Sequence, residues 1–217
     1  MSEDEATQIL LSNLDGEAKG EPRTIRFTPG IRRKSWVRNV VAIGLSSGFI
    51  EPLESTSIHV IQTAINRLID LLPAGEVSQA TRDDFNQRTR FEMERIRDFI
   101  ILHYHANQRE GEVFWDDLRA MEVPQTLQHK MDLFRATARV SASFDELFDA
   151  RAWYQVLIGQ NVIPENYNPI ADLLPEPRLK EFLDGLERTH VAEVSQWKDH
   201  GAFVGQFAPV NRELVPA

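Results

Sequence analysis

Apolar residues recur every three or four positions between Ile58 and Leu72, and this periodicity constrains the fold more than any other feature of the sequence. The spacing places the apolar side chains along one face of an α-helix. Pro73 follows directly and cannot continue a helix, so we expect the helix to end there. Its start is expected near residues 55–57, because Pro52 disfavours helix at the residue before it. The apolar positions are Ile58, Ile61, Ile65, Leu68, Ile69 and Leu72.

Helical patterns fill most of the rest of the chain. In the segment 81–107 we expect Thr81 to cap the helix, with Asp84 three residues later, and at the N-terminal end Ser2 or Asp4 is the expected cap. The inner side of the segment 81–107 is marked by Phe85, Ile96, Phe99, Ile100 and His103. The further predicted helices span residues 2–14, 81–107, 123–140, 143–160 and 178–200.

Only a short stretch near the N-terminal end carries strand signals. Residues 23–36 alternate between apolar and polar around Ile25 and Phe27, with a Pro-Gly turn after them. Residues 39–45 form a compact apolar run that is typical of a buried strand, although a buried helix has the same pattern. One or two strands do not make a stable sheet, so a segment outside this chain would have to complete it. The predicted fold class is mainly α with a small β portion.

The charge balance and the residue types exclude several classes of function. The 217 residues carry a net charge of −9 and include no cysteine. The acidic balance argues against nucleic acid as the main partner, and no apolar run reaches the roughly 20 residues that span a membrane. Without cysteine there are no disulfides, thiolate metal sites or cysteine nucleophiles, which fits a cytoplasmic protein. No histidine pair has the i, i+4 spacing of a helical metal site, so no metal is predicted.

The stretch EPLESTS places two glutamates, Glu51 and Glu54, at the start of a helix. The first amides of a helix lack intrahelical acceptors and lie at the positive end of the helix dipole, so they form an anion site. The amides of Thr56 and Ser57 are therefore expected to hold a small anion. A carboxylate beside such a site is electrostatically unfavourable, which points to a function for Glu54. The alternative is that Ser55 caps a core helix whose dipole Glu54 favours.

Several stretches of this sequence together resemble the flavin-dependent tryptophan halogenases. The GFIEPLEST stretch is the most specific of them, and the resemblance covers nearly the whole chain. It implies the C-terminal part of an α/β flavin-dependent monooxygenase-like halogenase fold. The resemblance is carried by RKSWVRNVVAIGLSSGFIEPLESTSIHVIQTAINRLIDLLP, RDFIILHYHAN, EVFW, MDLFRATARV and WYQVLIGQNVIPENYNPIADLL.

The resemblance also implies a chemistry and a set of site residues. In that family, reduced FAD, oxygen and a halide, chloride or bromide, give hypohalous acid, which reaches a lysine beside tryptophan or another indole. Ser57 stands where the family usually has glycine. The matching positions are Glu54 and Ser55 for catalysis, Thr56 and Ser57 for the halide, and Leu45 and Ile58 for contact with the flavin.

The stretch ELFDARAWYQVLIG resembles the family's segment that packs on the substrate ring. Its candidates for substrate binding are Phe148, Trp153 and Tyr154. Stacking on such side chains would hold an indole plane and fix which ring carbon reacts. The alternative for the same three residues is ordinary core packing.

Parts of the family pattern have no match in this sequence. The chain contains no Gly-x-Gly-x-x-Gly fingerprint for FAD, and neither the catalytic lysine nor the Trp-x-Trp-x-Ile-Pro motif is present. Residues 1–75 are therefore expected to be a remnant of the flavin and substrate core, and residues 76–217 a helical substrate-binding region. The chain is expected to be inactive alone and to need the N-terminal FAD-binding half.

Two hypotheses from different classes remain open at this point. In the first, the chain is the C-terminal portion of a halogenase whose further partners are the indole substrate and a flavin reductase. In the second, it is a non-catalytic helical module that binds an aromatic ligand or a partner protein. The intact Glu54, Ser55 and Thr56 favour the first. The sequence leaves the oligomeric state open, with a homodimer among the alternatives.

Overall fold

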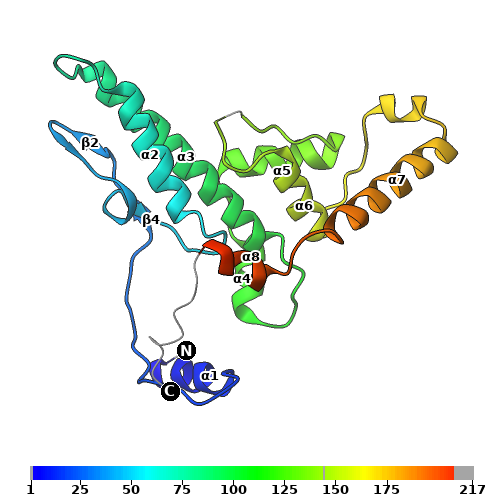
Figure 1. Ribbon diagram of the computed structural model, residues 1–217, viewed down its shortest axis with the longest axis horizontal. Coiled ribbons are helices and arrows are strands. Elements are labelled where there is room, and N and C mark those ends of the chain that lie inside the picture. Colours follow the sequence, from blue (N-terminus) through cyan, green and yellow to red (C-terminus); the bar gives the residue numbers. More distant parts are fainter. Residues whose placement is uncertain (1, 144, 208–217) are drawn as a thin grey trace. The chain divides into compact units, whose positions relative to one another are not determined.

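The computed structural model describes residues 2–143 and 145–207, and it is dominated by helices (Figure 1). The chain divides into two compact units, residues 1–165 and residues 166–217. The expected boundary between residues 75 and 76 thus falls inside the first unit. The expected division between a remnant of the flavin and substrate core and a helical substrate-binding region stays a prediction, because it concerns function and not compactness.

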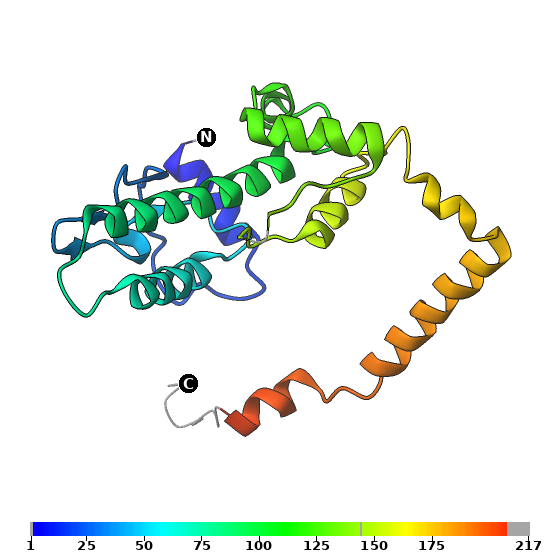
Figure 2. The same ribbon diagram turned by 90° about the horizontal axis from the view of Figure 1, so that it is seen from above.

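Two long helices form the frame of the first unit. Helix α2 covers Ser57–Leu71 and helix α3 covers Gln79–His105, and the two run side by side in Figures 1 and 2. Val60 and Ala64 of α2 are buried, while α3 buries residues along most of its length. The predicted start and end of α2 are confirmed. The predicted cap of α3 is wrong: the helix begins at Gln79, so the cap is Ser78, three residues before Thr81, and the Ser78 hydroxyl accepts the amide of Thr81.

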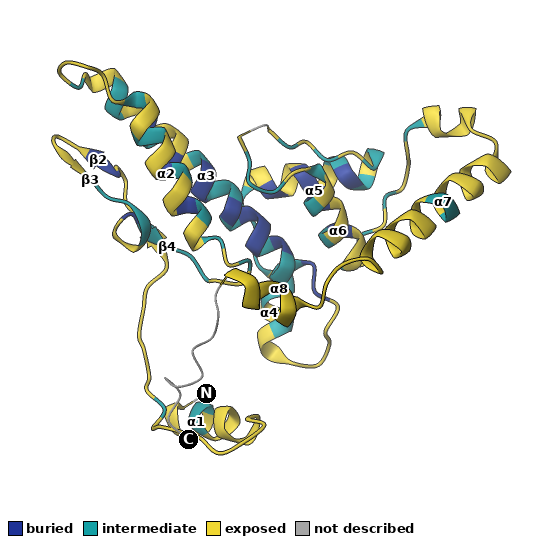
Figure 3. Ribbon diagram, viewed as in Figure 1, coloured by how far each residue is buried: buried dark blue, intermediate teal, exposed yellow. Residues whose placement is uncertain are grey.

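Shorter helices complete the core around α3. The largest cluster of buried side chains joins Phe99 and Leu102 of α3 to Leu127 and Phe134 and to Trp153. Pro124 directly precedes the first residue of α5. Figure 3 shows the buried residues concentrated along α3 and the helices that pack against it. These helices are α4 (Val113–Ala120), α5 (Gln125–Thr137) and α6 (Ala150–Gly159).

The β portion is smaller than the sequence indicates. Ile25 and Phe27 lie outside any strand and are exposed, so the expected strand around them is wrong. The run 39–45 holds only strand β3 and the start of the short 3-10 helix η1 (Gly44–Ser46), because the chain folds back on itself there as a hairpin. The antiparallel pairs are β1 (Gly30–Ile31) with β4 (Gly48–Phe49), and β2 (Trp36–Val37) with β3 (Val40–Val41).

The N-terminal helix α1 (Glu3–Ser12) starts as predicted. The Ser2 hydroxyl accepts the amide of Glu5, and the Glu5 carboxylate accepts the amide of Ser2. This reciprocal pair satisfies two amides that would otherwise lack acceptors at the helix start. Ser2, rather than Asp4, is therefore the cap.

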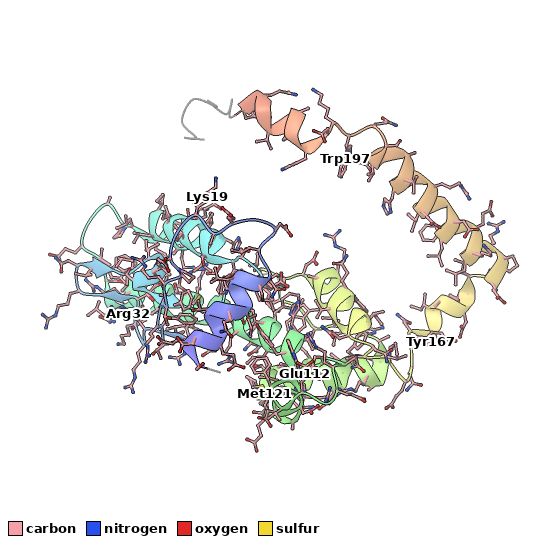
Figure 4. The ribbon with its side chains drawn as sticks, turned by 90° about the horizontal axis from the view of Figure 1, so that it is seen from below. Lys19, Arg32, Glu112, Met121, Tyr167 and Trp197 are labelled. Atoms are coloured by element: carbon pink, nitrogen blue, oxygen red, sulfur yellow. The ribbon has the colours of Figure 1, made fainter. Side chains whose placement is uncertain are left out.

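The second unit contains the 3-10 helix η2 (Pro169–Leu173), α7 (Glu176–Val194) and α8 (His200–Phe207). The single helix expected over residues 178–200 is thus interrupted after α7. Its apolar side chains, including Phe182 and Leu183, are exposed, and Trp197 projects from the chain in Figure 4. Within the residues that the structure describes, no helix is long and apolar enough to cross a membrane.

Candidate functional site

The site is built at the junction between a tight turn and the start of α2. The Ser55 amide donates to the Pro52 carbonyl at 2.9 Å, which closes the turn, and Ser55 adopts a positive φ of 53°. Thr56 then occupies the N-cap position, with no side-chain hydrogen bond to the helix. The alternative in which Ser55 caps the helix is therefore wrong, because its left-handed backbone places it one residue before the cap.

The opening amides of α2 remain available for an anion. Within residues 2–143 and 145–207, neither the Thr56 nor the Ser57 amide has a recorded acceptor. Beside them lies a small, mostly apolar cavity of about 50 Å³, enough for a single small ion. The cavity thus brings together the two halide candidates and Leu45. It is lined by Gly44, Leu45, Gly48, Phe49, Ile50, Thr56, Ser57, Val60, Ile61 and Met93.

Glu54 does not point into bulk solvent. Its Oε1 lies 2.8 Å from the Nε2 atom of His103 on α3, and the two side chains are 30% and 19% exposed. The other ring nitrogen, Nδ1, lies 2.8 Å from the Phe99 carbonyl oxygen. The main-chain carbonyl accepts only, so Nδ1 carries a proton in this arrangement. His103 was expected on the inner side of its helix, and the sequence gives no sign of its contact with Glu54, 49 positions away.

Glu51 hydrogen-bonds to Tyr104, the residue that follows His103 on α3. Partial burial, a hydrogen bond to Glu51 and the negative charge of Glu51 raise the pKa of Tyr104 to about 12. The Tyr104 ring stacks on Trp115 of α4, with ring centroids 6.0 Å apart. The two glutamates that flank Pro52 are therefore held by successive residues near the end of α3.

The three aromatic candidates for substrate binding differ in their surroundings. Trp153 is 1% exposed and packs edge-on against Phe99, as the core-packing alternative describes. Phe148 is half-buried and stacks on Phe99 with centroids 3.9 Å apart. The Tyr154 phenol donates to the Ala138 carbonyl and keeps part of its ring exposed. Phe99 thus contacts two of the aromatic candidates and also His103, which holds Glu54.

The two candidates for flavin contact present open apolar surface. Leu45 on η1 is 75% exposed, and Ile58 in the first turn of α2 is 73% exposed. Ile58 does not line the small cavity, whereas Leu45 does. Exposed aliphatic side chains beside an anion site fit contact with a flat ring system. The residues present therefore fit the halide and one apolar side of a flavin.

The sequence profile of tryptophan halogenases matches residues 1–176, and this match includes the α2 junction, His103 and all three aromatic candidates. The chain belongs to the tryptophan halogenase family. The family predicted from the EPLEST stretch is therefore confirmed.

Individual tryptophan halogenases show the same relationship. The chain is 33% identical over 186 residues to the tryptophan 6-halogenase SttH of Streptomyces toxytricini, covering 83% of this chain and 36% of that protein. It is 30% identical over 192 residues to the tryptophan 7-halogenase RebH of Lentzea aerocolonigenes, covering 81% of this chain and 36% of that protein. The chain thus spans about a third of the length of these relatives.

Solved halogenase structures have the same fold over this part. The flavin-dependent halogenase Xcc4156 of Xanthomonas campestris superposes with a TM-score of 0.90 and 40% identity, covering 96% of this chain and 42% of its own. BrvH, a flavin-dependent halogenase of Brevundimonas sp. BAL3, superposes with a TM-score of 0.88 and 40% identity, covering 95% of this chain and 42% of its own. The predicted fold class, mainly helical and part of a flavin-dependent halogenase fold, is confirmed.

Proposed function

We propose that this chain supplies the halide site and the substrate-side carboxylate of a flavin-dependent halogenase that acts on tryptophan or a related indole. The observation that carries the proposal is the α2 junction. There, the Thr56 and Ser57 amides, which have no recorded acceptor among the described residues, follow two and three positions after Glu54, whose carboxylate is held by His103. One rigid helix start thus fixes the distance between the halide and the acid, which is the preorganisation that catalysis requires.

In the complete enzyme, reduced FAD and oxygen would supply the oxidising power that turns chloride or bromide into hypohalous acid. The amides of Thr56 and Ser57 hold the halide. Leu45 and Ile58 provide apolar contact on the flavin side, and Ser55 links that side to the substrate side. Glu54 works on the substrate side with a lysine that lies outside this chain.

The substrate ring is held by the aromatic segment of α6 and the loop before it. Phe148 and Tyr154 support this role because their rings are partly accessible. Trp153 is buried and supports the site by packing against Phe99. Phe148 and His103 both pack against Phe99, so an indole stacked on Phe148 would lie near the part of α3 that holds Glu54.

The missing FAD fingerprint and lysine would come from an N-terminal half. The outward side of α2 supports such a partner, because a line of aliphatic residues there is exposed. Burying apolar surface of this kind is the main driving force for association. A flavin reductase would supply the reduced cofactor. The exposed aliphatic residues are Ile58, Ile61, Ile65, Ile69 and Leu72.

Co-expression with the N-terminal half of a related halogenase tests this function. The purified pair would receive reduced FAD, oxygen, bromide and tryptophan, and halogenated product would be measured by mass spectrometry. We expect product from the pair, none from this chain alone, and at least a tenfold loss of kcat in the Glu54→Gln variant. The control is Glu110→Gln, which changes an exposed glutamate outside the site.

Two outcomes would count against the proposal. Product from the isolated chain would show that the N-terminal half is not needed. Full activity of the Glu54→Gln pair would remove the carboxylate from the reaction. If the pair binds an indole without any turnover, the alternative of a non-catalytic module for aromatic ligands is favoured instead.

A further inference from the structure

We propose that His103 is a positioning residue that holds the Glu54 carboxylate through a proton lying between the two side chains. This inference rests on the proposed function, in which Glu54 acts at the reacting centre. It adds a residue on α3 to a site that otherwise lies on the turn before α2. The contact is the 2.8 Å approach of Nε2 to Oε1.

The imidazole is fixed from behind by the core. Its Nδ1 lies 2.8 Å from the carbonyl of Phe99, one helical turn earlier. The ring stands edge-on to the Phe99 side chain, with centroids 4.9 Å apart and planes at 81°. Phe99 is itself buried and stacked on Phe148. These contacts leave the imidazole one orientation and direct Nε2 to Glu54.

The chemistry of the two atoms requires a proton between them. Nδ1 donates to a carbonyl, so in a neutral imidazole Nε2 would be an acceptor. An ionised carboxylate oxygen is also an acceptor, and two acceptors do not approach to 2.8 Å favourably. Either the imidazole or the carboxyl group therefore carries the additional proton. In both forms Oε1 is held, while Oε2 has no recorded partner among the described residues.

Other charged groups nearby are already engaged. Tyr104, the next residue on α3, hydrogen-bonds to Glu51. His59 on α2 lies 3.4 Å from the buried Glu92, which also pairs with Arg67. Within the described part of the chain, His103 is thus the basic group that the structure places against Glu54.

Nitrogen NMR of the full chain, labelled with ¹⁵N-histidine, tests the contact without any need for turnover. The His103→Gln variant assigns the His103 signals. In Glu54→Gln a neutral amide takes the place of the carboxyl group and its NH₂ group donates to Nε2, so the proton shared between Nε2 and Oε1 is lost and the His103 ring signals shift. Glu51→Gln makes the same chemical change three residues away, and it is expected to leave the His103 signals in place. Unchanged His103 signals in Glu54→Gln would overturn the proposal.

Kinetics of the reconstituted pair separate positioning from a merely structural role. His103→Ala is expected to lower kcat at least tenfold while the KM for bromide stays the same, because the halide amides are untouched. His103→Gln is expected to recover activity to within about threefold, since its amide can donate to Oε1. His105→Gln, which alters a histidine bound to the Leu118 carbonyl, is the control. An equal loss in His103→Gln and His103→Ala would overturn the positioning role.

The NMR and kinetic experiments together distinguish a failure of this inference from a failure of the proposed function. If no reconstituted pair is active, the proposed function fails, but the NMR result still decides whether Glu54 and His103 share a proton. Circular dichroism of each variant checks that the fold is retained. A His103→Ala variant that fails to fold leaves His103→Gln and Glu54→Gln to decide the question.

Discussion

Ser55 connects the carboxylate of Glu54 to the amides of Thr56 and Ser57 through an unusual backbone conformation. Its φ of 53° lies in the left-handed region, which costs roughly 1–2 kcal/mol for a residue with a Cβ. Such strain persists where the surroundings determine it, and it often marks functional sites. Here it turns the chain sharply enough for Glu54 to reach His103 while α2 starts directly afterwards.

The Ser55→Gly variant is expected to be more stable than the wild type, by up to about 1 kcal/mol, because glycine adopts positive φ without the steric cost. Urea unfolding would measure this. Ser57→Gly makes the same change in the first turn of α2 and is expected to lower stability by about 0.5 kcal/mol. A loss of stability in Ser55→Gly as large as in Ser57→Gly would contradict the strain at Ser55.

The raised pKa of Tyr104 predicts how stability depends on alkaline pH. The folded state keeps the phenol protonated up to about pH 12, whereas the unfolded chain loses the proton near pH 10. The contribution of Tyr104 is therefore complete below pH 10 and is lost as the pH rises through about 12. Denaturant titrations of Tyr104→Phe should show a smaller loss of stability over this window. A loss of stability in Tyr104→Phe as large as in the wild type between pH 10 and pH 12 would contradict this contribution of Tyr104.

The short strand β4 depends on a glycine at its start. A Cβ on Gly48 would lie 2.8 Å from the Gly30 carbonyl oxygen and 3.1 Å from the Ile31 Cα, so the pairing of β1 with β4 would have to shift. Gly48→Ala is expected to lower stability by about 1–3 kcal/mol, as for other overpacked sites. Gly75→Ala, whose Cβ meets open space, should stay within about 0.5 kcal/mol of the wild type. Equal urea midpoints for the two variants would contradict the close approach.

The long helices could be predicted from the sequence, whereas the short helix α4, the break between α7 and α8, and the strands could not. Long segments such as α3 carry many turns of apolar periodicity, so the helix is predicted even though the predicted cap, Thr81, lies three residues after the observed cap, Ser78. The alternation around Ile25 and Phe27 is local, and it does not specify a strand when no partner strand lies beside it. The pairing of β1 with β4 joins segments 18 positions apart, and nothing in either segment indicates the other.

Only those parts of the candidate site that lie close together in the sequence could be predicted from it. The order of Glu54, Ser55 and Thr56 at a helix start is local, and the amides follow from it. The contact with His103 depends on how α3 packs against the turn, which is a tertiary property. The burial of Trp153 also follows from packing, because an aromatic residue on an amphipathic helix has the same pattern in a core and in a binding site.

The molecule as a whole leaves much apolar surface uncovered, including the outward side of α2. If this side docks on an N-terminal half, Ile69→Glu should weaken binding of that half at least tenfold, because a charge would then have to be buried. The free energy of unfolding of Ile69→Glu alone should stay within about 0.5 kcal/mol of the wild type. Val113→Glu, at a position on α4 that is 77% exposed where Ile69 is 63% exposed, is the control. Calorimetric titration that gives equal affinities for both variants would exclude α2 as the docking surface.

Anomalous diffraction from crystals of this chain soaked in bromide tests most directly whether the start of α2 is a halide site. The account predicts an anomalous peak within hydrogen-bonding distance of the Thr56 and Ser57 amide nitrogens, beside the cavity lined by Leu45. Crystals that bind bromide elsewhere but show no peak at these two amides would contradict it.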